Sequence, residues 1–594
     1  MKKLDTLNSI LKEYNSGNKK KAYKKFKNIF ELNKKNLQLR YNLAVMEQEL
    51  GLYDEAEINY KFLIKNGSNI KAKINLYNIY LKKNFILKAL DLVNSILITN
   101  PKLDNIIQDR VFILFKLKKY DLAIEECKKI INKKKENAYI LNTLAWSYYH
   151  INKIDKAELI FLEILKKDNK DIQILNSLGR FYHELRNSEK SREYFTQAMS
   201  IDSNIFETLN NFAGFCLEES EYENALKLYK KAEKINPNHS ILLNNISKAY
   251  FTMGEINIAE KYCKRAIILD SNNEDIRKNL SLIYIKNFNF KKGWDYFDSR
   301  LGLSDFIAKN NTLDIVRDKI PKNNKIDKKS KILIIREQGV GDEILYGTMY
   351  HDFIKLFSNS IIECDQRLIP IFQNSFETKD SDKFVKLGSF SNYKDKVKNF
   401  DYVIYAGSLG KFVRNELKDF PKNPYLKKIN NIKNTELDTI IKKQKKTKIG
   451  ISWKSFKNRY AKEKSLELLD FEKLFQNSNS IFFNLQYGET KIEIENFIKK
   501  YGYDIITLKS IDLFNDITGL TNLLTNLDLF ITVSNSTAHL AGALGIKTFL
   551  IKPDNHASYH YWNYDNGKTP WYPTVEIITK NDLINNNFIQ EKFI

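Results

Sequence analysis

The chain has 594 residues, which is too long for one core, and its 43% hydrophobic and 28% charged residues are typical of a folded protein, excluding a disordered or collagen-like one. The net charge is +24, but 83 of the 96 basic residues are lysine and only 13 are arginine, the residue suited to bidentate phosphate and guanine contacts. We interpret the charge as a compositional bias and expect no nucleic-acid partner.

The cysteines and the N-terminus favour a reducing compartment. The four cysteines form no CxxC pair, so neither a metal site nor a disulfide framework is expected. No apolar run approaches the roughly 18 residues of a membrane span. The N-terminus lacks the apolar segment of a secretory signal. We therefore expect a cytoplasmic protein without a transmembrane segment.

A repeat occupies the N-terminal half. Small residues recur at steps of 33 or 34 residues, at Ala22, Ala56, Ala89, Ala123, Ala157, Ser191, Ala225, Ala259 and Gly293. A larger, mostly apolar residue follows four positions after each, as at Phe26 and Tyr60. This pattern resembles the tetratricopeptide repeat, in which two antiparallel helices fill 34 residues and units stack to bury their apolar faces. We expect an α solenoid of eight to nine units over residues 1–302.

A weaker periodic signal predicts a peptide-binding groove. Asparagine occupies the sixth position of the first helix in several repeats, at Asn42, Asn75, Asn211, Asn245 and Asn279. In a tetratricopeptide superhelix this position faces the concave groove, where amides can bind a peptide main chain. The O-linked N-acetylglucosamine transferases carry such a ladder. The alternative is that asparagine is simply common in this chain, because Asn176, Asn210 and Asn244 stand one position earlier.

The pattern changes after the last repeat. Gly293 and Trp294 replace the usual pair in the unit at 277–301, and a polar, lysine-rich stretch follows. We expect a linker over residues 303–330. From Lys331 short apolar runs alternate with helical stretches, which indicates parallel α/β sheets. The predicted strands are the run KILIIRE at 331–337 and the segments 360–365, 401–407, 448–453, 481–486, 527–533 and 547–552.

Specific segments of this half resemble a known family. EQGVGDE after the first strand, ECDQRLIPIFQNSF at 363–376 and GSLGKFVRNELKDFP at 407–421 are similar to bacterial proteins that join tetratricopeptide repeats to a heptosyltransferase-like glycosyltransferase domain. GISWKS, KSLELLDFEKL, NLQYGE, SNSTAHLAGALG and WYP follow in the family's order. The resemblance implies a GT-B fold of two Rossmann-like halves, 331–433 on the acceptor side and 448–594 on the nucleotide-sugar side, separated by a joint at 434–447.

The resemblance and the strand ends together suggest a donor site. Ser534, Asn535, Ser536 and Thr537 follow a predicted strand at the start of a helix, where hydroxyl, amide and backbone donors can bind a diphosphate. An ordinary helix cap is the alternative. In heptosyltransferases an aspartate stands where this chain has Ser534. The resemblance further implies donor contacts by His539 and by Lys464 near the phosphates, with one solvated lysine among 83 as the alternative for Lys464. Gln486, Tyr487 and Glu489 follow the end of a predicted strand, where α/β sheets bind ligands, so we expect Glu489 or nearby backbone to contact the nucleoside.

The base is expected from the first half. Asp342 follows Gly341 at a predicted helix start, and the resemblance implies that this aspartate deprotonates the acceptor. A helix-capping role is the alternative, and Glu337 and Glu343 are nearby substitutes. Gly339 and Gly341 would let the backbone approach the ligand.

An aromatic group stands near the C-terminus. It comprises His556, Tyr559, His560, Tyr561, Trp562, Trp571 and Tyr572. Two interpretations of this group are open: its rings stack on a sugar or base, or they pack within the C-terminal segment. The spacing of His556 and His560 lacks an acidic partner pattern, so we expect no metal site.

The resemblance thus implies a bacterial, metal-independent, inverting glycosyltransferase without a cofactor beyond its nucleotide-sugar co-substrate. Its repeats would recruit a protein or peptide acceptor. Two alternatives remain. One is a non-catalytic scaffold with a degenerate sugar-nucleotide-binding domain, which the serine at 534 favours. The other is a transferase acting on lipid or polysaccharide.

Overall fold

The computed structural model describes residues 2–67, 69–83, 85–132, 137–303, 306–307, 312–321, 325–386, 395, 397–430, 432–443, 445–455, 464–476, 479–552, 560–562 and 567–584. The histidine and the tyrosine at 556 and 559 of the aromatic group, and the side chain at 560, lie outside this set. The chain divides into two compact units, Met1–Ser203 and Asn204–Ile594. No helix among the described residues has the length and the apolar run that a membrane span requires.

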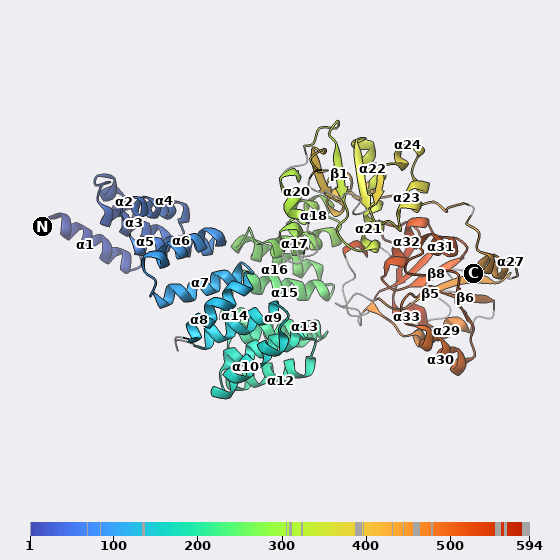
Figure 1. Ribbon diagram of the computed structural model, residues 1–594, viewed down its shortest axis with the longest axis horizontal. Helices are drawn as coiled ribbons and strands as arrows, with labels where there is room; N and C mark the ends of the chain where they lie inside the picture. The colour runs from blue at the N-terminus through green and yellow to red at the C-terminus, as the bar shows by residue number, and fades with distance from the viewer. Residues whose placement is uncertain are drawn as a thin grey trace. The chain divides into compact units, whose positions relative to one another are not determined.

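The first unit consists of antiparallel helix pairs (Figure 1). Its helices are α1 (Lys2–Asn15), α2 (Lys19–Glu31), α3 (Leu37–Glu49), α4 (Tyr53–Lys65), α5 (Ile70–Lys82), α6 (Ile86–Thr99), α7 (Asp104–Lys116), α8 (Tyr120–Asn132), α9 (Ala138–His150), α10 (Ile154–Lys167), α11 (Ile172–Glu184) and α12 (Ser188–Ile201). Each pair packs through the predicted small residue, which is fully buried, as at Ala56 and Ala123. The helical solenoid predicted from the 34-residue period is therefore confirmed.

The second unit begins with three more pairs of the same kind. They are α13 (Phe206–Glu218), α14 (Tyr222–Ile235), α15 (Ser240–Thr252), α16 (Ile256–Leu269), α17 (Glu274–Lys286) and α18 (Phe290–Phe297). In two pairs a serine of the first helix donates to the carbonyl of the small residue in the second, at 2.7 Å from Ser247 to Ala259 and 2.8 Å from Ser281 to Gly293. These bonds bring the two helices of a pair into close contact.

The first sheet of the C-terminal region has four parallel strands. They are β1 (Ile332–Ile335), β2 (Ser360–Cys364), β3 (Phe384–Lys386) and β4 (Tyr402–Tyr405), in the order β3-β2-β1-β4. The principal helices of this half are α21 (Val340–Gly347), α22 (Tyr350–Leu356) and α23 (Ile369–Ser375). Shorter helices are α20 (Leu313–Val316), α24 (Thr378–Ser381) and α26 (Gly410–Val413).

The second sheet has six parallel strands. They are β5 (Thr447–Ser452), β6 (Ser480–Asn484), β7 (Ile505–Ile506), β8 (Leu529–Thr532), β9 (Thr548–Ile551) and β10 (Val575–Ile578). Their order is β10-β9-β8-β5-β6-β7, which is the doubly wound order 3-2-1-4-5-6 counted within this half. Its helices are α29 (Glu472–Phe475), α30 (Lys491–Tyr501), α31 (Ile517–Leu524), α32 (Ser536–Leu544) and α33 (Lys580–Ile584). The predicted parallel α/β architecture is present in both halves.

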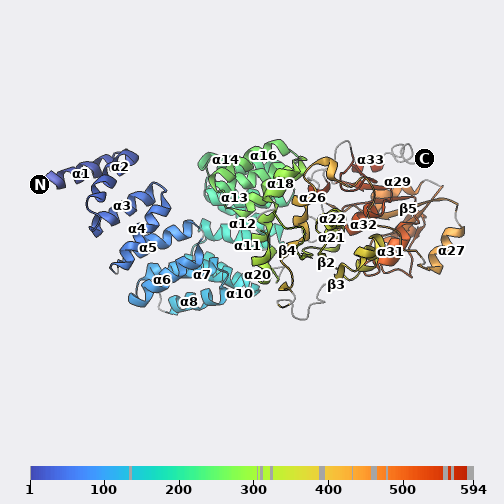
Figure 2. The ribbon, with the colours of Figure 1, turned by 90° about the horizontal axis from the view of Figure 1, so that it is seen from above.

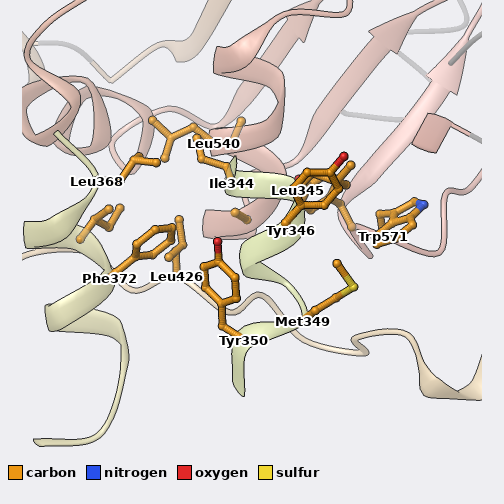
Figure 3. Close-up of a cluster of buried hydrophobic side chains, with 14 of the residues drawn as sticks. Ile344, Leu345, Tyr346, Met349, Tyr350, Leu368, Phe372, Leu426, Leu540 and Trp571 are labelled. Atoms are coloured by element: carbon orange, nitrogen blue, oxygen red, sulfur yellow. The ribbon is translucent and has the colours of Figure 1, made fainter. Parts of the chain in front are cut away.

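One apolar core runs through both sheets and the last repeat. It includes Trp294 of α18, Ile344 of α21 and Leu540 of α32. Figure 3 shows the part where the two halves meet, with Tyr350 and Phe372 of the first half near one another and their ring centroids 5.8 Å apart. Because α21 and α32 contribute to the same core, their N-terminal ends are fixed relative to one another.

The segments predicted as linker and joint also pack against the sheets. In 303–330, Leu313 and Val316 of α20 are buried against β1 and β4. In 434–447, helix α27 (Thr435–Lys443) buries Leu437 in the main core, and Glu436 accepts from the backbone N–H of Ser510 at 2.9 Å. Both connections thus have fixed positions in their described parts.

Candidate functional site

The two sheets direct the carboxyl ends of their central strands toward one region. In the first sheet β1 ends at Ile335 and continues into the glycine turn, where Gly339 precedes α21 with an extended backbone. In the second sheet β8 ends at Thr532 and continues into α32. In each sheet these strands adjoin the point where the strand order reverses, which is where open α/β sheets bind ligands.

A cavity of about 320 Å³ lies between these two helix starts. Most of the residues predicted for the donor and the base line it together, namely Gly339, Gly341, Asp342, Lys464, Tyr487, Ser534, Asn535, Ser536, Thr537 and His539. Residues that the sequence analysis did not single out complete the wall, among them Arg336, Arg367, Ser455, Phe514 and Leu513. The structure therefore brings segments nearly 200 residues apart to one site.

The glycine turn makes direct contact with the second half. A Cβ at Gly341 would stand 3.2 Å from the Ser536 Cα and 3.2 Å from the His539 ring. Helices α21 and α32 lie side by side, as Figures 1 and 2 show. A residue without a side chain at this position permits the close approach of the two helix N-termini.

Asp342 lies in the first turn of α21 and is only 5% exposed. The Gln338 amide, in the orientation that satisfies its neighbours, donates to both carboxylate oxygens of Asp342 at 3.2 Å. Burial and then the Asp342 carboxylate raise the pKa of Tyr561 well above its usual value. The carboxylate thus lines a largely enclosed site, where a base can act on a bound hydroxyl.

The two glutamates considered as substitutes have other partners. Glu337 accepts from Arg300 Nε at 2.8 Å and from Arg300 Nη2 at 2.9 Å, as well as from the backbone N–H of Gly407. Glu343 accepts from the Asp365 backbone N–H at 2.7 Å. Burial raises the pKa of Glu343 to about 7. Neither glutamate lines the cavity, so Asp342 is the one of the three candidate carboxylates that the structure places there.

Two arginines supply positive charge from the first half. Arg336 follows β1, and its Nη1 donates to Asp365 Oδ2 at 2.9 Å. Arg367 follows β2, and its Nε and Nη2 donate to the two oxygens of Asp365 at 2.9 and 3.0 Å. These contacts hold the pKa of Asp365 far below its usual range. Charged residues after two neighbouring parallel strands are a signal that sequence reasoning could have used.

The second half supplies the opposite wall. Asn535 caps α32, with its Oδ1 accepting from the Ala538 N–H at 3.0 Å, and it also lines the cavity. The Ser534 hydroxyl accepts from Trp562 Nε1 at 2.9 Å. Lys464 is 5% exposed and lies on the same wall. The helix start is therefore both a capped terminus and part of the cavity. A helix-capping role and a place in the predicted donor site are thus compatible for Asn535.

The aromatic group surrounds His539. Trp562 stacks on its ring with centroids 4.6 Å apart, and the Tyr572 hydroxyl is 3.0 Å from His539 Nδ1. Trp562, Trp571 and Tyr572 are buried in the core, whereas Tyr561 lines the cavity. Of the described residues of this C-terminal aromatic group, Tyr561 is thus the one that lines the cavity.

Gln486 and Glu489 lie apart from this cavity. Gln486 Oε1 accepts from the backbone N–H groups of Trp453 and Lys454 at 2.8 and 2.7 Å, which ties the end of β6 to the end of β5. Gln486 and Tyr487 line a second cavity of about 600 Å³. Glu489 is exposed and lines neither cavity. Its predicted donor contact therefore has no support in the geometry.

The asparagine positions differ from one another. Asn279 is buried, and its Nδ2 donates to Asn244 Oδ1 at 2.9 Å, so the prediction that it faces a groove is wrong. Asn75 Nδ2 donates to the Tyr60 hydroxyl at 3.0 Å, and Asn245 Nδ2 donates to Asn210 Oδ1 at 3.1 Å. Asn42, Asn75, Asn211 and Asn245 are partly exposed. The intervening repeats carry Asp109, Thr143 and Ser177 at this position, so the ladder is interrupted.

Comparisons with known proteins bear on the repeats. Models of the tetratricopeptide repeat match residues 114–202 and 242–269. Protein FlbA of Caulobacter vibrioides is 26% identical over 256 residues, which are 41% of this chain and 42% of that protein. The chain therefore spans less than half the length of this relative.

Solved structures of repeat proteins are also similar to part of the chain. A tetratricopeptide repeat protein from Parabacteroides merdae is 18% identical with a TM-score of 0.38, over 41% of this chain and 97% of that one. A thermophilic repeat protein of Thermus thermophilus is 20% identical with a TM-score of 0.26, over 28% and 90%. The family models and the helix pairs show that the chain contains tetratricopeptide repeats.

Proposed function

We propose that the protein is a metal-independent glycosyltransferase with a GT-B arrangement of its two α/β halves, which transfers a sugar from a nucleotide-sugar donor to an acceptor hydroxyl. The observation that carries this proposal is the cavity of about 320 Å³, where Asp342 and the glycine turn of one half face the Ser534–Thr537 helix start of the other. The doubly wound strand order of the second half supports a nucleotide at this edge.

The donor would bind with its diphosphate at the start of α32. The backbone N–H groups of a helix N-terminus favour an anion, and Lys464 adds a charge from the same half. Both are in place before the reaction, so they can neutralise the charge that develops on the leaving diphosphate without reorganising. In this scheme no metal ion is required.

Asp342 would act as the base. It takes the proton of the acceptor hydroxyl, whose oxygen then attacks the anomeric carbon. The bond from that carbon to the diphosphate oxygen breaks, and the nucleoside diphosphate leaves with the electron pair. A single displacement of this kind inverts the anomeric configuration. The repeats would recruit the acceptor protein or peptide, with the partly exposed asparagines as candidate contacts.

Turnover of a panel of nucleotide sugars, with water and then peptides as acceptors, tests this role. Asp342→Asn should lower kcat by at least about 100-fold, because it removes the base. Donor affinity should stay within threefold. Asp382→Asn, an exposed position of the same half, is the matched control and should match wild type. Turnover unaffected by Asp342→Asn would remove Asp342 as the base.

One observation favours a second candidate, a non-catalytic scaffold that binds a sugar nucleotide. The Ser534 hydroxyl accepts a hydrogen bond from Trp562 and stands where the resembling family has an aspartate. Donor binding without turnover on any acceptor would favour the scaffold. Turnover with a lipid or polysaccharide acceptor, but with none of the peptides, would instead favour a transferase acting on lipid or polysaccharide.

A further inference from the structure

A second, more open cavity of about 490 Å³ adjoins the candidate donor site. It shares Arg336, Arg367 and Phe514 with that site. The remaining lining residues are Asp365, Gln366, Lys386 and Asn515. We call it the basic cavity. Most of its wall comes from the carboxyl ends of β1, β2 and β3, which belong to the first half.

The charge of the basic cavity is positive. Arg336, Arg367 and Lys386 face one carboxylate, Asp365, in its lining. Asp365 stays ionised because the two arginines hold its pKa far below the usual range. Lining cations exceed lining carboxylates by three to one, so an anion is the ligand that this cavity favours.

The arginines keep donors for such an anion. Arg367 Nε and Nη2 donate to Asp365, and its Nη1 donates to the Phe514 carbonyl at 3.0 Å. Arg336 contacts Asp365, the Gln338 carbonyl and Glu343. A guanidinium has five N–H groups, so among the described contacts each arginine has two left. Asp365 holds both guanidinium groups in place, which lowers the conformational entropy that they lose when they bind a carboxylate.

An aromatic side chain flanks these charges. Phe514 is 57% exposed, and its ring centroid lies 5.3 Å from the Arg367 guanidinium carbon. An exposed ring beside a fixed cation offers an apolar surface next to the anion-binding groups.

We propose that the basic cavity binds an acidic side chain of the acceptor peptide, next to the residue whose hydroxyl is glycosylated. This inference rests on the proposed function, in which the second half binds the donor and the first half faces the acceptor. A peptide is favoured over a free acidic sugar because the chain contains tetratricopeptide repeats, a scaffold that presents extended surfaces to protein segments.

Calorimetry on the full chain at low salt tests the proposal with two capped peptides, Gly-Asp-Asp-Ser-Asp-Asp-Gly and its Asn counterpart. The Asp peptide should bind at least fivefold more tightly to wild type. That preference should fall below twofold in Lys386→Gln and in Arg367→Gln. Lys355→Gln removes the same charge from an exposed position on α22 and should keep the preference. Lys386 is exposed, so its variant should fold even if the Arg367 variant does not.

Equal binding of the two peptides, or a preference that all three variants keep or lose alike, would overturn the proposal. Glucuronate binding that depends on Lys386 and Arg367, without peptide binding, would replace the peptide by an acidic sugar. A tenfold loss of nucleoside diphosphate affinity in Lys386→Gln would assign the cavity to the donor. If no nucleotide sugar binds wild type while the Asp peptide still shows its preference, the proposed function fails and the anion site stands.

Discussion

Asp365 shows how a residue without a direct role can organise a site. It binds both arginines that line the cavity, one after β1 and one after β2. The sequence predicted Asp342, Lys464 and the Ser534–Thr537 run because each stands in a motif. It did not predict Arg336 or Arg367, because the resemblance assigns them no role, although both stand at or just after the ends of predicted strands.

Glu343 gives a residue-scale prediction about pH. Burial raises its pKa from 4.5 to about 7, so the folded protein binds a proton that the unfolded chain has lost between these values. Stability contributed at this position is therefore present at pH 4 and lost as the pH rises toward 7. The Glu343→Gln variant lacks this titration. Between pH 4 and pH 8, wild type should lose up to about 3 kcal/mol more unfolding free energy than the variant.

Urea unfolding followed by tryptophan fluorescence measures this difference, since four of the five tryptophans lie in the second unit. Glu377→Gln, an exposed glutamate of the same half, serves as the control and should follow wild type at both pH values. Parallel pH profiles for wild type and Glu343→Gln would contradict the account of a buried carboxylate whose pKa is raised by burial.

At the scale of elements, all the central strands were predicted, whereas β4 was the only edge strand predicted among the described residues. Seven predicted strands are present, among them β1, β5 and β8. The three that were missed, β3, β7 and β10, have only two to four residues and each lies at the edge of its sheet. An edge strand is short and buries less apolar surface, so its sequence pattern is weak.

The turns between the helices of a pair have a regularity that the small-residue pattern did not reveal. Among the described repeat turns, residues with positive φ recur at 34-residue steps at Gly17 and Gly51, and again from Lys118 through Asn152, Arg186, Ser220 and Gly254 to Phe288. Five of these are not glycine, although the left-handed conformation favours glycine. Stacking of the pairs thus imposes this conformation on whichever residue the sequence places there.

Lys118→Gly should therefore stabilise its repeat by about 1 kcal/mol, because glycine adopts the left-handed conformation without the Cβ penalty. Hydrogen exchange of the α7 and α8 amides should slow by about fivefold. Lys119→Gly is the matched control, since this neighbour is exposed and lacks a positive φ, and it should speed exchange. Faster exchange in Lys118→Gly would show that the left-handed conformation of Lys118 has no free-energy penalty that glycine relieves.

At the scale of the molecule, the last repeat is built into the α/β core. Trp294 of α18 donates from Nε1 to the Arg414 carbonyl at 2.6 Å, and a Cβ at Gly410 would stand 2.3 to 2.6 Å from three of its ring carbons. Lys286 of α17 donates to the Trp562 carbonyl at 3.3 Å, and burial lowers its pKa to about 8. The departure of this repeat from the pattern at Trp294 has a physical reason, since this side chain serves the junction, whereas Gly293 contacts Ile285 of α17 within the repeat.

This junction reaches the candidate site through a short chain of contacts. Trp562, which accepts from Lys286, stacks on His539 and donates to Ser534. The repeat period alone could not predict this, because it describes contacts between neighbouring repeats only. The second unit is therefore a single packed body in which helices of the repeats support the cavity wall.

Calorimetric titration of the full chain with a panel of nucleotide sugars tests the central claim most directly. We predict that one donor binds with a Kd below about 1 mM, and that Lys464→Gln weakens it at least tenfold because a charge at the diphosphate is lost. Lys473→Gln, an exposed lysine of the same half, should bind like wild type. If no nucleotide sugar binds wild type, or if Lys464→Gln binds as tightly as Lys473→Gln, the cavity is not a sugar-nucleotide site as described.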